Sequence, residues 1–263
     1  MDISNSTSVV VGGASGLGAA AARCLVAAGV DCLIIDRDSE RGQAVADELG
    51  PAARFACADI TDADAIGAAL ATPRRLPLRI VVNTAFMPGG QRVIGRRGEP
   101  HDLDLFRRLV EVNITGTFNC IRLGAAAIAR EAPLADGERG VIINTASIVA
   151  FDGQEGQCAY AAAKGAIVSM TLPLARDLRQ HGIRVVTIAP GTFLTPPVAA
   201  APQSIREIFE RSALTPGRLG HPDEFGQFVL QACQNSYMNG DTFRLDGGAR
   251  LPMRDDPRPS SAG

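Results

Sequence analysis

The chain has 263 residues, of which 46% are apolar and 21% charged, and its formal net charge is −2. This length and apolar content suffice for one α/β domain. The arginines are dispersed, so the charge pattern excludes a nucleic-acid stripe. With no apolar stretch of membrane-spanning length and no export signal expected, the sequence predicts a cytoplasmic protein without a membrane partner.

The cysteines and histidines point to neither disulfides nor a metal. None of the six cysteines forms a Cys-x-x-Cys pair, so reduced thiols in a cytosol are predicted. The three histidines have no metal-ligand spacing, and no metal is expected.

The first motif is a glycine-rich turn after a short apolar strand, Val9–Val11, and before an alanine-rich helix to about residue 28. In this context Gly12 makes a tight turn, Gly16 lets the backbone approach a diphosphate, and Gly18 lets the helix pack against the strand. The sequence therefore predicts a dinucleotide site. Because the spacing is not the common Gly-x-Gly-x-x-Gly, a turn without a ligand is the alternative.

A carboxylate follows the second predicted strand, Cys32–Ile35. Asp36 lies 18 residues beyond Gly18, where it would bind the adenosine ribose hydroxyls and repel a 2′-phosphate. Arg37 next to it favours NADP instead. However, the repulsion between a carboxylate and a facing 2′-phosphate outweighs the attraction of a flexible neighbouring arginine. The predicted cofactor is NAD.

The middle of the chain continues the alternation, with a helix at about 39–49 and strands at 54–58 and 78–82. Residues 61–64 resemble a capping box for the intervening helix, in preference to a cluster of metal ligands. Residues 87–101 are rich in glycine and are predicted to form a functional loop.

Two helices at about 102–112 and 114–131 are predicted to join at Asn113, a polar residue suited to a kink that carries a water. A fifth strand at 141–146 then leads to a helix that continues to about residue 180.

The last third begins with a strand at 183–189, followed by an irregular segment at 191–215 that is predicted to be a mobile substrate lid and to contain a short helix at 203–212. A helix at about 223–234 and a strand at 242–245 complete the alternation. The predicted fold is one doubly wound parallel sheet of about seven strands in a single domain, residues 1–251, with a disordered tail at 252–263.

Tyr160 and Lys164 are four residues apart in an alanine-rich segment, so a helix would place both side chains on one face. Lys164 is the only lysine; the other 25 of the 26 basic residues are arginines. A nearby ammonium favours phenolate and lowers the pKa of a tyrosine from its ordinary value of about 10. The pair predicts an acid/base centre, and the alternative is a solvated lysine beside a packed tyrosine.

Taken together, these motifs resemble the short-chain dehydrogenase/reductase family over residues 8 to about 250. The resemblance is strongest to its type II 3-hydroxyacyl-CoA dehydrogenase branch, also described as 17β-hydroxysteroid dehydrogenases. The residues that carry it are Gly12–Gly18, Asp36, Asp59, Asn83, Asn113, Val141–Ser147, Tyr160, Lys164, Thr171–Asp177, Thr187–Gly191 and Arg244–Gly247.

The resemblance implies a role for each matching residue. Tyr160 would be the acid/base, Lys164 its pKa-lowering neighbour and a ribose ligand, and Ser147 the donor to the reacting oxygen. Asn113 would hold a water that links Lys164 to solvent. The implied cofactor-binding residues are Gly12, Ser15, Gly16, Leu17, Gly18, Asp36, Asp59, Ile60, Asn83, Thr84, Ala85, Tyr160, Lys164, Pro190, Gly191, Phe193 and Thr195.

Gln154 and Gln157, between Ser147 and Tyr160, would contact substrate or cap the loop. The implied activity is NAD-dependent oxidation of a secondary alcohol, with 3-hydroxyacyl-CoA first and hydroxysteroids second. A catalytically idle NAD-binding scaffold is the alternative from another class. The family also implies a homotetramer, with interfaces on the apolar helices at 102–131 and 158–180.

Three residues depart from the family pattern. Val11 stands where threonine is usual, which predicts the loss of a hydroxyl tie to the glycine turn. Thr84 and Phe86 replace parts of the usual Asn-Asn-Ala-Gly run. Because glycine permits close backbone approach, Phe86 is predicted to narrow the site or weaken NAD binding.

Overall fold

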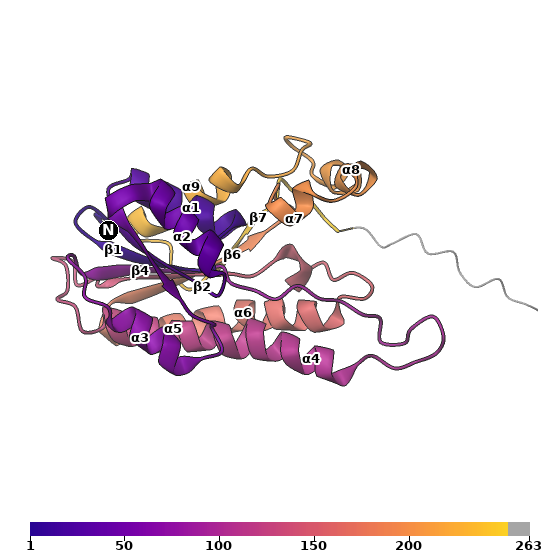
Figure 1. The fold of residues 1–263 in the computed structure, drawn as a ribbon, viewed down its shortest axis with the longest axis horizontal. Coiled ribbons are helices and arrows are strands. Elements are labelled where there is room, and N and C mark those ends of the chain that lie inside the picture. The colour runs from indigo at the N-terminus through magenta and orange to yellow at the C-terminus, as the bar shows by residue number, and fades with distance from the viewer. Residues whose placement is uncertain (252–263) are drawn as a thin grey trace, which may run out of the picture.

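A single parallel sheet organises the protein, for which a computed structural model describes residues 1–251; the tail at 252–263 lies outside them. The strand order is β3-β2-β1-β4-β5-β6-β7, and every neighbouring pair is parallel. This confirms the predicted doubly wound sheet (Figure 1). The strands are β1 (Thr7–Val11), β2 (Asp31–Asp36), β3 (Ala53–Cys57), β4 (Leu78–Asn83), β5 (Gly140–Thr145), β6 (Ile183–Pro190) and β7 (Thr242–Leu245).

Helices cover both faces of the sheet (Figure 1). One layer contains α1 (Gly16–Ala27), α2 (Ser39–Leu49) and α9 (Pro222–Gln234). The other contains α3 (Ala63–Ala71), α4 (Leu103–Val110), α5 (Thr117–Ile128) and α6 (Cys158–Asp177). Two further helices, α7 (Pro196–Ala199) and α8 (Gln203–Ser212), lie within the segment predicted as a lid.

Alternation along the strands divides the core between these layers. Val10 of β1 packs in the cluster that contains Phe225 of α9, whereas Val9 and Val11 pack in the cluster that contains Ile121 of α5. Successive side chains of a strand point to opposite faces, so a continuous apolar run serves both cores.

A π-helix, Glu111–Gly116, separates α4 from α5, where the sequence predicted only a kink at Asn113. The predicted capping box at 61–64 is wrong in its details. Asp62, not Thr61, caps α3 by accepting from the main-chain N–H groups of Asp64 and Ala65, at 3.0 and 2.9 Å. Thr61 instead donates to Asp59 from both its main-chain N–H and its hydroxyl.

Within residues 1–251, one helix, α6, is long and apolar enough to cross a membrane by length and composition. The sequence had predicted no such stretch. A core helix of a soluble protein passes the same test, and α6 buries Lys164 and Ile167 beside the sheet.

Candidate active site

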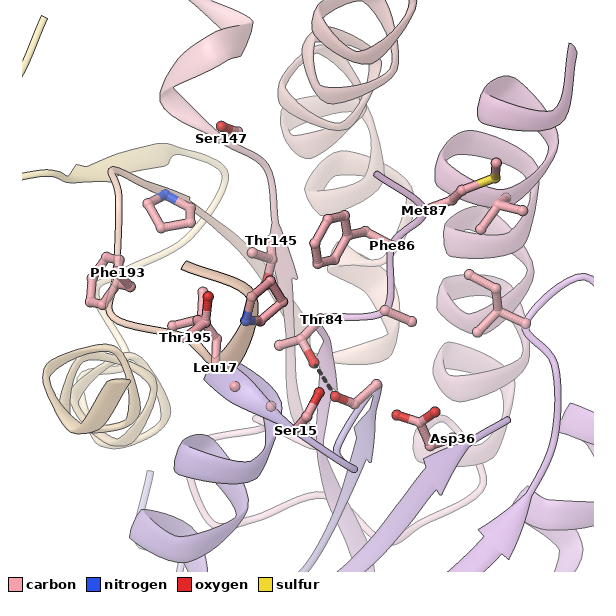
Figure 2. A pocket seen from close by; sticks show the side chains of 18 of the residues that line it. Ser15, Leu17, Asp36, Thr84, Phe86, Met87, Thr145, Ser147, Phe193 and Thr195 are labelled. Atoms are coloured by element: carbon pink, nitrogen blue, oxygen red, sulfur yellow. Dashed lines mark hydrogen bonds between the residues drawn. The ribbon is translucent and has the colours of Figure 1, made fainter. Parts of the chain in front are cut away.

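A cavity of about 430 Å³ lies where the strands end at their carboxyl side (Figure 2). This is the place at which open parallel sheets bind ligands. Most of the predicted cofactor residues line it: Gly12, Ser15, Gly16, Leu17, Gly18, Asp36, Asp59, Ile60, Thr84, Ala85, Tyr160, Lys164, Pro190, Gly191, Phe193 and Thr195.

The glycine turn packs directly against the end of β4. Gly12 has φ +80°, and a β-carbon there would overlap the main chain of Ala85. The hydroxyl of Thr84 donates to the carbonyl of Val11 at 2.8 Å and to that of Gly12 at 3.2 Å. Figure 2 draws one hydrogen bond from Thr84 as a dashed line. Val11 itself has no hydroxyl to offer, as predicted from the sequence, and Thr84, directly after β4, supplies a hydroxyl tie to the same turn.

The Asp36 carboxylate is held at the far end of the cavity. Its two oxygens accept from the main-chain N–H groups of Ala14 and Asp38, both at 3.1 Å. Asp59 lines the same cavity. Two hydrogen bonds from Thr61 lower the pKa of the Asp59 carboxyl, and the one from the Thr61 main chain has a larger effect than the one from its hydroxyl. This end of the cavity therefore presents fixed acceptors to a ligand's hydroxyl groups.

Lys164 is buried beside Tyr160, as the helical spacing predicted. Its side chain is 2% exposed, its amine donates to the carbonyl of Thr145 at 2.9 Å, and Nζ lies 5.8 Å from the centroid of the Tyr160 ring. The alternative of a solvated lysine on an ordinary helix is therefore wrong.

Burial shifts both groups away from their charged forms. It raises the pKa of Tyr160 to about 12, against a smaller opposing effect of the hydrogen bond with Ser147. It also lowers the pKa of Lys164 to about 7. The sequence predicted a lowered pKa for the phenol, but within the protein alone desolvation outweighs the neighbouring amine, whose described hydrogen bond goes to Thr145.

Three predicted residues do not line a described cavity. The side-chain amide of Asn113 accepts a hydrogen bond from the main-chain N–H of Met87 at 2.9 Å and donates one to the Met87 carbonyl at 3.0 Å. Asn83 donates to Asn144 of β5. Gln154 is also absent from the lining. Asn113 therefore fixes the loop after β4 with its side-chain amide, and its predicted water stays a prediction.

A second cavity, of about 570 Å³, adjoins the first at Tyr160 and contains Gln157 in its lining. The side-chain oxygen of Gln157 is buried and has no hydrogen-bond partner among the described residues. Gln157 therefore carries an unsatisfied acceptor in the lining beside the candidate acid/base, and its predicted contact with substrate stays a prediction.

The sequence reasoning missed an arginine that supports the Ser147 turn. Arg244 of β7 makes a bidentate pair with Asp152, at 2.9 and 2.6 Å, and also binds Asp246 at 2.7 Å. Asp152 lies just after the short 3₁₀ turn, Ile148–Ala150, that follows Ser147. The arginine therefore anchors this turn to the last strand. The only sequence signal was its place in the motif Arg244–Gly247.

Comparison with known proteins gives the class to which this fold and site belong. A family model described as short chain dehydrogenase matches residues 6–205. The chain belongs to this family of oxidoreductases, which confirms the predicted resemblance.

Individual relatives narrow the similarity. The chain is 43% identical over 252 residues to 3-hydroxyacyl-CoA dehydrogenase type-2 of Drosophila melanogaster, covering 95% of this chain and 99% of that one. It is 43% identical over 246 residues to the Homo sapiens protein of the same name, with 92% and 94% covered. The crystal structure of 3-hydroxyacyl-CoA dehydrogenase type-2 from Mycobacterium avium matches with TM-score 0.92 and 41% identity, over 94% of this chain and 97% of that one.

Replacing Lys164 with methionine should change how stability depends on pH. The pKa of Lys164 is about 7 in the folded protein and about 10.5 ordinarily, so between these values the unfolded chain binds a proton that the folded protein does not. The contribution of Lys164 to folding stability therefore rises with pH across this window. The stability of Lys164→Met relative to wild type should therefore be highest near pH 6 and lower near pH 9. Urea denaturation at both values measures this, and a pH-independent difference would contradict it.

Replacing Arg244 with lysine should lower kcat by about tenfold or more, because a loosened Ser147 turn misplaces the donor to the reacting oxygen. Arg23→Lys is the matched control, since Arg23 makes a bidentate pair with Glu48 at 2.8 and 2.7 Å and is not in the cavity lining. Steady-state kinetics and urea denaturation of both variants separate positioning from stability. Equal kcat values in the two variants would show that Arg244 only stabilises the fold.

Proposed function

We propose that the protein is an NAD-dependent dehydrogenase that interconverts a 3-hydroxyacyl-CoA and a 3-oxoacyl-CoA. The observation that carries this proposal is that Tyr160, Lys164 and Ser147 line one cavity with the Asp36 carboxylate. The names of the relatives above supply the choice of acyl-CoA.

The residues of the cavity fit a nicotinamide dinucleotide. The N-terminus of α1 borders the cavity without an acidic residue in its first turn, as a diphosphate site requires. Asp36 supplies fixed acceptors for ribose hydroxyls. At the Ser147 end, Thr145 lines the cavity, and its buried hydroxyl has no hydrogen-bond partner among the described residues. A polar cofactor group would satisfy it.

When bound, oxidised NAD would supply the hydride acceptor and a positive charge near the phenol. Ser147 would donate a hydrogen bond to the substrate oxygen. Tyr160, as phenolate, would take the proton of the substrate hydroxyl while the carbinol hydride leaves, so the alcohol becomes a ketone. Because burial disfavours charge on both Tyr160 and Lys164, phenolate formation depends on this added positive charge.

Asp36 is expected to set the preference for NAD over NADP. Its carboxylate would repel a 2′-phosphate, and because it is pinned by two main-chain N–H groups it cannot turn away easily. Wild type should therefore use NAD with a kcat/KM at least about tenfold higher than for NADP. Asp36→Ala, with Arg37 left to pair the phosphate, should reduce or reverse this ratio. An unchanged ratio in the variant would assign the selectivity elsewhere.

The proposed reaction is tested by the formation of NADH from NAD and 3-hydroxybutyryl-CoA. Tyr160→Phe should lower kcat by at least about a hundredfold, because the general acid/base is lost. Tyr237→Phe removes the hydroxyl of the other tyrosine, which is 99% exposed, and should keep wild-type kinetics. NAD binding without turnover of any acyl-CoA or hydroxysteroid would favour the idle scaffold instead.

The assembly and location of the protein stay predictions. Phe118 of α5 and Leu172 of α6 are 44% and 45% exposed, and these apolar side chains support the proposal that further copies pack on this layer as a homotetramer. The six cysteines are free thiols in the described structure, which is compatible with the proposed cytoplasmic location.

A further inference from the structure

Phe86 lies where the two cavities beside the candidate acid/base meet. Phe86 and Tyr160 are the two residues that line both the cavity of about 430 Å³ and that of about 570 Å³. The second cavity is otherwise lined by the segments 88–92 and 155–157. A substrate that reaches Tyr160 from the second cavity therefore passes the Phe86 ring.

The ring is in contact with the catalytic pair. Its centroid is 6.3 Å from that of Tyr160, with the planes inclined at 55°, and Lys164 Nζ lies 5.6 Å from it. Both distances are those of contacting aromatic and cation–π pairs. Figure 2 shows the ring projecting into the cavity from the segment after Thr84. Any group on this side of a carbinol carbon at Tyr160 therefore meets the ring.

The main chain on both sides of Phe86 is fixed. Ala85 donates to the carbonyl of Val11 at 3.1 Å. Met87 donates to and accepts from the side-chain amide of Asn113, at 2.9 and 3.0 Å. The ring therefore cannot retreat with its backbone to admit a wide substrate, and can only rotate about its own side-chain bonds. Rotation away from the site would give up its contact with the Lys164 amine.

We propose that Phe86 restricts the site to secondary alcohols whose carbinol carbon lies in an unbranched chain, and that it selects against alcohols carried on fused rings. This inference rests on the proposed dehydrogenase function and names its substrate class. An unbranched acyl chain is narrow beside its carbinol carbon, whereas the ring carbons of a hydroxysteroid are wide on both sides. The aromatic ring fills the space that glycine would leave open at this position.

The test compares kcat/KM for 3-hydroxybutyryl-CoA and for a 17β-hydroxysteroid, both with saturating NAD. Wild type should favour the linear substrate. Phe86→Ala should raise the steroid-to-linear ratio by about tenfold or more, as expected for space opened in an apolar pocket. Phe86→Leu, which keeps most of the volume, should give a smaller change and serves as the second variant if Phe86→Ala does not fold. Tyr237→Ala, which truncates an exposed aromatic side chain, should leave the ratio unchanged.

The outcomes distinguish the inference from the function on which it rests. A wild-type protein that oxidises the steroid as well as the linear substrate, or an equal ratio in wild type and the Phe86 variants, overturns the inference and leaves the dehydrogenase intact. An effect of Phe86 that acts only through NAD affinity changes both substrates together, keeps the ratio constant and also overturns it. Turnover of neither substrate by wild type overturns the proposed function and the inference with it.

Discussion

Burying a lysine amine costs free energy, and the fold offsets part of this cost at Lys164 with one hydrogen bond to the carbonyl of Thr145, at 2.9 Å. This hydrogen bond joins α6 to the end of β5, the strand that also leads to Ser147. The Lys164 amine, the Tyr160 phenol and the Ser147 hydroxyl are consequently held together at the same end of β5. The desolvation that lowers the pKa of Lys164 also raises that of Tyr160, so in the protein alone burial favours the neutral form of both groups.

A second constraint holds the other side of the site. The glycine turn after β1 and the segment after β4 pack so closely that a β-carbon at Gly12 would overlap Ala85. The side chains of Thr84 and Asn113 then form hydrogen bonds with main-chain groups of this region. Their effect is to fix the main chain on both sides of Phe86, whose ring lies between the two cavities.

The local motifs were predictable because their chemistry is encoded by neighbouring residues. A strand, a glycine turn and a helix follow one another directly, and so do β2 and Asp36. Tyr160 and Lys164 share a helix face through their spacing. In contrast, the contact of Arg244 with Asp152 joins residues 92 positions apart, and that of Thr84 with Val11 joins residues 73 apart. Nothing in the local pattern selects such partners, which is why the sequence did not predict the bond from Thr84 to Val11 or the bonds between Asn113 and Met87.

The sequence by itself determined the order of strands and helices, the parallel sheet and the chemical groups available at its carboxyl edge, because periodicity, turn residues and spacing are local properties of the chain. Only the tertiary structure decided which of those groups lose contact with water and which atoms they bind. Desolvation and hydrogen-bond partnership depend on segments that meet in space, so the pKa shifts of Tyr160 and Lys164 and the position of the Phe86 ring emerge only once the sheet and its helices are assembled.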